Sequence, residues 1–386
     1  MSFFVDYAAV NLNKFGEELC GDTVEFFRSK DSSIAVLSDG LGSGVKANIL
    51  STLTAKIAIT MLKEGLPIEE VVDTIIHTLP VCQVRKLAYS TFTIVKIDDK
   101  GMAYVVEFDN PNLFFIHDNK IQNLESSVTN INGRKIKEST FQIVEGDTLV
   151  FVSDGAIHAG VGNLMNLGWG WSEVADFIER MPHYAMSSKE IANKLLDACD
   201  ALYIGEPGDD TTVVALKLIR PKKVTLFSGP PKDYTKDKEI IRDLMEGTGQ
   251  KIVCGGTASN IVSRELQENM EIDMEYVDKN IPPIAHIKGI NLVTEGVLTI
   301  RATIEMLNKI KNSTDLNFLY EKNGAAKLAR ILFEDCTHLQ MLIGRAINPA
   351  HQNPDFPEEL SIKYKLLMDL QRTLENLGKV VEVKYY

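Results

Sequence analysis

The 386-residue chain is poor in cysteine, tryptophan and positive charge, and each shortage excludes a class of protein. It has five cysteines and two tryptophans, and its 53 acidic residues outnumber 41 lysines and arginines, which leaves a net charge of −12. No C-x-x-C spacing occurs, so the sequence predicts neither a zinc ribbon nor a thioredoxin motif. No basic stripe supplies the attraction that nucleic acids and anionic membranes require, so we expect neither as a partner.

Long apolar runs are missing as well. No stretch approaches 18 consecutive apolar residues, so the sequence predicts no membrane span. The N-terminus has no basic segment followed by an apolar core, so it does not resemble a signal peptide. Cysteines that are widely spaced and odd in number favour reduced thiols, and we therefore expect a cytoplasmic protein.

Acidic residues, in contrast, stand where strand-like segments end or begin. Ser38-Asp39-Gly40 and Ser153-Asp154-Gly155 each end an apolar run, Asp22 borders a third strand-like segment, and Asp209-Asp210 precedes a fourth. Clustered acids repel one another and are costly to desolvate, so such a group implies a cation. Oxygen ligands without histidine or thiolate favour Mg²⁺ or Mn²⁺.

Each of these motifs also has a simpler interpretation. A single Asp-Gly after a strand is more often a turn, because the Asp side chain bonds nearby backbone and glycine accepts a positive φ. The four elements together, in a plausible order within one domain-sized stretch, favour the metal interpretation. The residues therefore predict a two-metal hydrolase.

The same motifs carry a resemblance to a known family. Roughly the first 218 residues resemble PPM-type metal-dependent serine/threonine protein phosphatases, in the branch of the sporulation protein SpoIIE and the RsbU-type stress-response phosphatases. The segment from about Pro221 onward resembles no family that we can name. The matching strings are Cys20-Gly21-Asp22, Ser38-Asp39-Gly40-Leu41-Gly42-Ser43-Gly44, Tyr89-Ser90-Thr91-Phe92, Asn110-Pro111, Ser153-Asp154-Gly155 and Asp209-Asp210-Thr211-Thr212.

This resemblance implies roles for the acids. Asp39 would bridge two Mn²⁺ or Mg²⁺ ions, and Asp22 and the Gly40 carbonyl would serve the second ion. Asp154 and Asp209 would hold the first ion, which makes Asp39, Asp154 and Asp209 the expected catalytic residues. A water between the ions, deprotonated at neutral pH, would attack the phosphoryl group in line without a phosphoenzyme.

Four further positions are less certain in role. Asp210 stands where relatives often have asparagine, so a supporting or accessory-metal role is favoured over that of a primary ligand. Leu41 occupies the position of a histidine proposed as general acid in eukaryotic relatives, and His158 is a weak substitute. Where relatives carry a phosphate-clamping arginine, Lys14 is the only cation, and a solvated loop lysine is the favoured interpretation. Both departures indicate a slow, partner-dependent enzyme.

The periodicity predicts an α-β-β-α sandwich, two facing mainly antiparallel sheets flanked by helices, over residues 1–219. A smaller α/β domain with alternating strands and helices follows over residues 220–386. The expected strands are 4–12, 22–28, 33–38, 90–97, 102–108, 212–218, 224–227, 251–254, 271–277, 289–293 and 380–385. The expected helices are 45–62, 68–79, 171–180, 188–202, 237–246, 295–311 and 357–377, and a further short helix is expected to follow a turn over 255–260 and to end at 266.

Three segments leave alternatives open. Residues 156–186, with both tryptophans among several glycines, form either a hinged regulatory flap or a plain loop and helix. Gly255-Gly256-Thr257 is favoured as a structural turn over an anion site on helix amides. The helix 357–377 is favoured as a core helix over an oligomer contact.

The predicted function is that of a bacterial signalling hydrolase, a metal-dependent serine/threonine protein phosphatase with a C-terminal regulatory or dimerisation domain. By resemblance its substrate is a phosphorylated regulatory protein, such as an anti-anti-sigma factor. Two alternatives remain, a non-catalytic metal-binding sensor and a small-molecule phosphate-ester hydrolase. Four clustered acids weigh against the sensor, because a protein without catalysis has no physical need for them.

Overall fold

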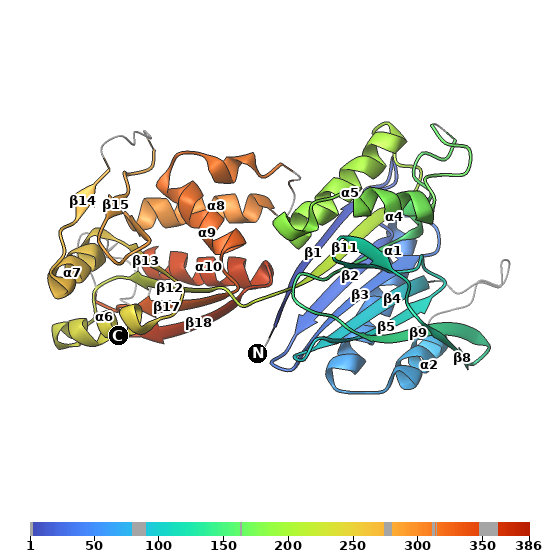
Figure 1. Cartoon of the computed structure of the whole chain (residues 1–386), viewed down its shortest axis with the longest axis horizontal. Coiled ribbons are helices and arrows are strands. Elements are labelled where there is room, and N and C mark those ends of the chain that lie inside the picture. Colours follow the sequence, from blue (N-terminus) through green and yellow to red (C-terminus); the bar gives the residue numbers. More distant parts are fainter. Residues whose placement is uncertain are drawn as a thin grey trace. The chain divides into compact units, whose positions relative to one another are not determined.

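The chain divides into two compact units, Met1–Arg220 and Pro221–Tyr386, next to the boundary predicted between residues 219 and 220. The computed structural model describes residues 3–78, 90–162, 164–273, 280–310, 313, 315–346 and 362–386. Figure 1 shows the first unit in blue to yellow-green and the second in yellow to red. Each unit is built around its own sheets and apolar core, so each is described by itself.

The first unit contains two mainly antiparallel sheets. The first sheet has the order β1-β11-β10-β6-β7, and the second has the order β2-β3-β4-β5-β9-β8. The strands of the first sheet are β1 (Phe4–Leu12), β6 (Phe114–His117), β7 (Lys120–Gln122), β10 (Thr148–Val152) and β11 (Thr211–Ile219). Those of the second are β2 (Asp22–Arg28), β3 (Ser32–Gly40), β4 (Ser90–Asp98), β5 (Met102–Phe108), β8 (Ser127–Ile131) and β9 (Arg134–Gln142).

Helices cover the outer face of each sheet. Buried residues of α1 (Gly44–Lys63) and α2 (Ile68–Thr78) pack with the second sheet, and those of α4 (Trp171–Glu179) and α5 (Ser188–Tyr203) pack with the first. A third cluster, with members such as Leu37 and Phe151, fills the space between the sheets. These layers confirm the predicted α-β-β-α sandwich.

β11 shows why its sequence reads as an unbroken apolar run. Val213 and Ala215 point into the core beneath the helices, whereas Val214 and Leu216 point into the core between the sheets. Both faces of the strand are therefore buried, which removes the polar alternation expected of a half-exposed strand.

α1 is the one helix in the described residues that is long and apolar enough to cross a membrane, by length and composition alone. One such helix is weak evidence, because core helices pass the same test. Ala55 and Ala58 of α1 are fully buried in the cluster that also contains Ile34 and Val36 of β3. The apolar face of α1 therefore packs on the second sheet.

The second unit is a doubly wound α/β sheet with the order β14-β15-β16-β13-β12-β17-β18. Its five parallel strands are arranged in space as the third, second, first, fourth and fifth along the chain. The strands are β12 (Lys223–Ser228), β13 (Gln250–Cys254), β14 (Glu271–Ile272), β15 (Ala285–His286), β16 (Leu292–Thr294), β17 (His338–Ile343) and β18 (Val380–Tyr385).

Helices pack on both faces of this sheet. One core cluster contains buried residues of α8 (Val297–Ile310), α9 (Gly324–Glu334) and α10 (Ile362–Asn376). The other contains buried residues of α6 (Asp237–Glu246) and α7 (Gly256–Leu266). Two helical layers over a largely parallel sheet are the arrangement expected from strand-helix alternation.

Several predicted boundaries are wrong. β3 continues through Gly40, so Asp39 lies inside a strand rather than in the turn after it, and the strand predicted over 289–293 is found at Leu292–Thr294. The helix predicted from residue 295 begins at Val297, after a separate bend. β17 and α9 were not predicted. Parts of the predictions over 68–79, 271–277, 295–311 and 357–377, together with Tyr89 and Cys82, fall outside the described residues.

Candidate metal centre

The second sheet brings two of the predicted acids together at one end. Asp22 begins β2 and Asp39 stands near the end of β3, and the two residues are direct partners in the antiparallel pair. On its other side Asp39 is paired with Thr91 of β4. Directly opposed residues in such a pair have Cβ atoms about 4.5–5.5 Å apart, so the two carboxylates are neighbours because of strand register.

The first sheet brings the other acids to one end in the same way. Asp154 starts the single turn α3 (Asp154–Ile157) directly after β10, and Asp209 and Asp210 directly precede β11, the antiparallel partner of β10. The Ser153 amide donates to the Thr212 carbonyl oxygen at 3.0 Å, and the Thr212 amide donates to Ser153 Oγ at 2.9 Å. These two bonds hold the Ser-Asp-Gly turn against the Asp-Asp-Thr-Thr segment.

Two glycines allow the ends of the two sheets to come close. A Cβ at Gly21 would lie 2.7 Å from Asp210 Oδ2, so the Asp210 carboxylate rests against the residue that precedes Asp22. A Cβ at Gly155 would lie 2.1 Å from the Asp210 carbonyl oxygen. Neither position has room for a side chain, which accounts for glycine at both.

The backbone around Asp39 is held by neighbouring groups. Ser90 Oγ donates to the Asp39 carbonyl oxygen at 2.9 Å and lies 2.5 Å from Ser38 Oγ. A Cβ at Gly40 would lie 2.1 Å from the Ala47 carbonyl oxygen of α1. The strand end that carries Asp39 and Gly40 is thus packed directly on the first turns of α1.

The acids raise one another's pKa. Burial raises the pKa of Asp39 to about 10, with further contributions from Asp22, Asp154 and Asp209. Burial also raises the pKa of Asp22 to about 7, together with Asp210 and Asp154. The pKa of Asp209 is raised by burial and by Asp154. These shifts mean that the negative charge of the group is poorly compensated by the protein.

Hydrogen-bond donors are scarce at this end of the sandwich. Both carboxylate oxygens of Asp22, Asp210 Oδ2, Thr91 Oγ1 and Asn110 Oδ1 are buried and have no hydrogen-bond partner among the described residues. The hydroxyls of Thr212 and Ser153 lie near enough to lower the pKa of Asp22, but neither meets hydrogen-bond geometry with its carboxylate. Buried oxygens without donors are rare in proteins.

This donor set fits hard divalent cations. Carboxylate, hydroxyl and carbonyl oxygens are the ligands that Mg²⁺ and Mn²⁺ prefer. Within the described part of the chain, no three acidic, histidine or cysteine side chains already form a metal-holding group.

The residues of uncertain role also have defined places. The Lys14 amide donates to Asp210 Oδ1 at 3.0 Å, and the Lys14 charge lowers the pKa of Asp209, so Lys14 lies beside the acids. Asp210 is buried, whereas Asp209 is partly exposed. His158 is exposed at the surface and donates its amide to the Asp154 carbonyl oxygen at 2.9 Å.

A cavity of about 340 Å³ adjoins Asp154. It is lined by Asn110, Pro111, Asn112, Asp154, Ile157, His158 and Trp171. The sequence placed Asn110-Pro111 among the family strings and Trp171 in a candidate flap, but it gave no sign that these segments meet. Their meeting depends on the meander between β5 and β6, whose path a single sequence does not specify.

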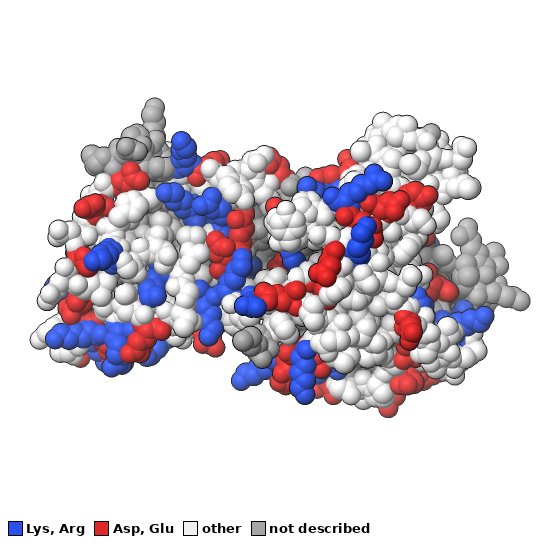
Figure 2. All heavy atoms as spheres, viewed as in Figure 1, with Lys and Arg blue, Asp and Glu red and all other residues white. Residues whose placement is uncertain are grey.

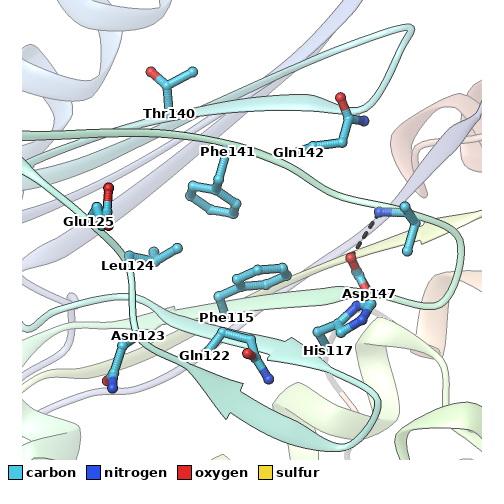
Figure 3. Close-up of a pocket in the computed structure, with 11 residues that line it drawn as sticks. Phe115, His117, Gln122, Asn123, Leu124, Glu125, Thr140, Phe141, Gln142 and Asp147 are labelled. Carbon is cyan, nitrogen blue, oxygen red and sulfur yellow. Dashed lines mark hydrogen bonds and ion pairs between the residues drawn. The ribbon is translucent and has the colours of Figure 1, made fainter.

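A second cavity, of about 400 Å³, lies where β6, β7 and the end of β9 come together (Figure 3). Phe115 and Phe141 face one another across it with ring centroids 4.8 Å apart, and His117 Nδ1 lies 2.7 Å from Asp147 Oδ1. This hydrogen bond and the negative charge of Asp147 raise the pKa of His117. Asp147 precedes β10 whereas Asp154 follows it, so this cavity is separate from the acid group.

The glycine turn of the second unit is explained by its backbone. Gly255 is the residue before α7 and has φ of 120°, a conformation that side chains rarely adopt. Its amide donates to the Thr294 carbonyl oxygen at 2.9 Å. These features agree with the structural turn favoured from the sequence.

On the face seen in Figure 2, acidic and basic side chains are interspersed over both units.

Comparison with known proteins assigns the first unit to a class. The family model of stage II sporulation protein E matches residues 29–219. Stage II sporulation protein E of Bacillus subtilis is 25% identical over 223 residues, which cover 56% of this chain and 26% of that protein. The chain thus matches about a quarter of the length of that relative.

Two solved structures are also similar to part of the chain. The PP2C phosphatase domain of Bacillus subtilis SpoIIE with a fragment of its regulatory domain is 23% identical, with a TM-score of 0.49 and coverage of 56% of this chain and 64% of that one. The RsbU and RsbW domains of Rv1364c from Mycobacterium tuberculosis are 17% identical, with a TM-score of 0.47 and coverage of 64% and 69%.

The first unit is thus a sandwich of two facing sheets that bring acids together at one end. Residues 29–219 of this unit match the family model of stage II sporulation protein E. Residues 220–386 lie outside the matched segment.

Proposed function

We propose that this protein is a Mn²⁺- or Mg²⁺-dependent serine/threonine protein phosphatase. The observation that carries the proposal is the group of four acids, Asp22, Asp39, Asp154 and Asp209, at one end of a SpoIIE-family sandwich, beside buried oxygens without donors. Raised carboxylate pKa values support it, because they express a charge imbalance that divalent cations would correct.

In this proposal two ions would be held by the carboxylates of Asp22, Asp39, Asp154 and Asp209 and by the Gly40 carbonyl oxygen. Asp39 would be the ligand that both ions need. Asp210, whose Oδ1 is bonded to the Lys14 amide, supports the group from behind or serves an accessory ion. The bound ions supply the Lewis acidity that activates water and neutralises phosphoryl charge.

The chain's own residues would position the phosphorylated substrate. Lys14, whose charge acts on Asp209, is the cation that would contact a phosphoryl oxygen. No histidine follows Gly40, since Leu41 occupies that place. The leaving seryl or threonyl oxygen therefore takes its proton from solvent or from a group of the substrate protein, which agrees with a slow enzyme.

We also propose a substrate, a role for the second unit and a location. A phosphoserine or phosphothreonine on a regulatory protein is the substrate that the family relationship favours. The α/β unit from Pro221 would regulate activity or form a homodimer, and free thiols at Cys20, Cys199, Cys254 and Cys336 agree with a cytoplasmic location.

The central test replaces Asp39 by asparagine. Asp39→Asn should lower Mn²⁺-dependent hydrolysis of a phosphoserine peptide by at least about 100-fold, because both proposed ions lose a ligand. Asp154→Asn should lower it as well, with partial recovery at high Mn²⁺. Asp98→Asn, at the far end of β4, is the matched control and should keep its rate. Unchanged activity of Asp39→Asn at saturating Mn²⁺ would refute the assignment.

The same assay separates the alternatives. A phosphatase acting on proteins hydrolyses the phosphopeptide better than sugar phosphates, whereas a small-ester hydrolase shows the reverse order. A sensor binds Mn²⁺, detectable by calorimetry, but hydrolyses neither compound nor p-nitrophenyl phosphate.

A further inference from the structure

The cavity beside Asp154 has one wall that is held rigidly. Trp171 Nε1 donates to the Asn112 carbonyl oxygen at 2.8 Å. The Trp171 ring stacks on Phe114, with centroids 4.7 Å apart and planes 14° from parallel. A hydrogen bond at its edge and a stacked ring on its face fix the indole, which still remains partly exposed. Rigid aromatic rings with a free edge or face are favoured contact surfaces for ligands.

The cavity shares one residue with the proposed metal centre. Asp154 lines it and, in the proposed function, would also hold an ion. Ile157, one turn further along α3, and Pro111 add apolar surface next to Trp171, and the polar lining comes from Asn110, Asn112 and His158. Among the described residues that line the cavity, Asp154 is the only carboxylate and none is a lysine or an arginine. The site is therefore better suited to an apolar group than to an acidic one, which would find no lysine or arginine there to pair with.

We propose that this cavity binds the apolar or aromatic side chain that neighbours the phosphorylated residue of a protein substrate. This inference rests on the proposed phosphatase function and specifies its substrate class. Consecutive Cα atoms are 3.8 Å apart, so a phosphoryl group among the acids leaves the next side chain within reach of the cavity. Leucine and phenylalanine fit the apolar wall, whereas a glutamate side chain would lose water against that wall without a cationic partner among the described lining residues.

The test compares short phosphoserine peptides that differ at one residue. One set places Leu, Phe, Ala or Glu after the phosphoserine, and a second set places the same residues before it. With Mn²⁺-loaded full-length protein, the Leu or Phe peptide of one set should have kcat/KM about tenfold above the Ala peptide, and the Glu peptide should be poorest. The difference should appear in KM, since the cavity holds the side chain equally before and during reaction.

Paired tryptophan variants identify the wall that is responsible. Trp171→Leu should reduce the ratio of kcat/KM between the Leu and Ala peptides to about one. Trp169→Phe is the control, because Trp169 packs on Phe177 and does not line the cavity, and its ratio should stay near the wild-type value. A wild-type ratio in Trp171→Leu would overturn the inference.

Fluorescence gives a second measurement if Trp171→Leu does not fold. The chain has two tryptophans, so Trp169→Phe leaves Trp171 as the only one. The Leu peptide should shift its emission at lower concentration than the Ala peptide, and the Glu peptide should shift it least. Equal responses to all peptides would overturn the inference.

The outcomes also separate this inference from the proposed function. If the protein hydrolyses p-nitrophenyl phosphate and gives the same kcat/KM for all the peptides, the phosphatase function is supported and the role of the cavity is overturned. Absence of any hydrolysis by the Mn²⁺-loaded protein would overturn the proposed function itself, and the cavity assignment with it.

Discussion

The two units differ in whether their buried acids have hydrogen-bond or ion-pair partners. In the first unit both carboxylate oxygens of Asp22 have no hydrogen-bond partner among the described residues, and the pKa of Asp22 is raised. In the second unit Asp237, also buried, is paired with Arg264. Burial raises the pKa of Asp243, but hydrogen bonds from Lys384 and Tyr386 lower it by more.

This contrast shows which unit stores electrostatic strain. An acid with a donor in its own fold contributes modestly to stability, whereas a buried acid without one costs free energy until something outside the chain compensates it. Only the first unit holds such a group of acids in the part of the chain that the structure describes. In the second unit the described acids Asp237 and Asp243 have partners within the unit itself.

Separating the units should give the largest effect. Each has its own core clusters, so we expect residues 1–220 and 221–386 to fold as fragments. The first fragment should retain metal-dependent hydrolysis of p-nitrophenyl phosphate, and the second should have none. Circular dichroism checks folding of both. A folded first fragment that binds Mn²⁺ but is inactive until the second is added would show that the active site is shared.

Metal should stabilise one unit only. At a free Mn²⁺ concentration 100 times the dissociation constant, binding adds about 2.7 kcal/mol to the free energy of unfolding. For a unit of this size that corresponds to a rise in melting temperature of roughly 5–10 °C. Calorimetric melting of the two fragments measures it, with Asp39→Asn as the control that should lose the rise. A similar rise in fragment 221–386 would contradict the contrast.

The sequence predicted the layers and the acids because both follow local rules. Alternating and continuous apolar runs indicate strands. Asp39 and Asp154 each precede a glycine near the end of such a run, and this pattern identified both as candidate ligands. The family strings added the order of the acids. Even so, Asp39 lies inside β3 and faces Asp22 by register, a pairing that the motif alone did not specify.

What the sequence missed depends on contacts between distant segments. The cavity beside Asp154 joins residues near 110, 157 and 171. The surroundings of Asp22 likewise join distant segments, because Asp154 and Asp210 of the other sheet both raise its pKa. β17 and α9 differ from these cases, because their signals are local. Leu328, Ala329 and Leu332 of α9 have helical spacing, and Leu339 and Met341 of β17 alternate as in a strand, so the sequence was sufficient to predict both.

Removing one acid from each unit should change stability in opposite directions. Without metal, Asp22→Asn should stabilise the protein by about 1–3 kcal/mol, because a buried charge without a donor disappears. Asp237→Asn should destabilise it by about 1 kcal/mol, since Arg264, itself largely exposed, loses one of its two acidic partners and keeps only Glu265. Urea unfolding in EDTA measures both. Destabilisation by Asp22→Asn under these conditions would mean that Asp22 has a donor in solution.

The pH dependence of stability should differ in the same sense, with a contribution from Asp22 alone of about 2–3 kcal/mol between pH 5 and pH 8. The pKa of Asp22 is about 7 in the folded state against its usual 3.8, so between these values the folded protein binds a proton that the unfolded chain releases. The free energy of unfolding of the metal-free first fragment therefore falls as pH rises through this window. The lowered pKa of Asp243 has its effect below pH 4, so fragment 221–386 should give a flatter profile.

Saturating Mn²⁺, which binds the deprotonated acids, should abolish or reverse the slope of the first fragment. Urea midpoints at four pH values test this, and a midpoint in EDTA that rises from pH 5 to pH 8 would contradict it.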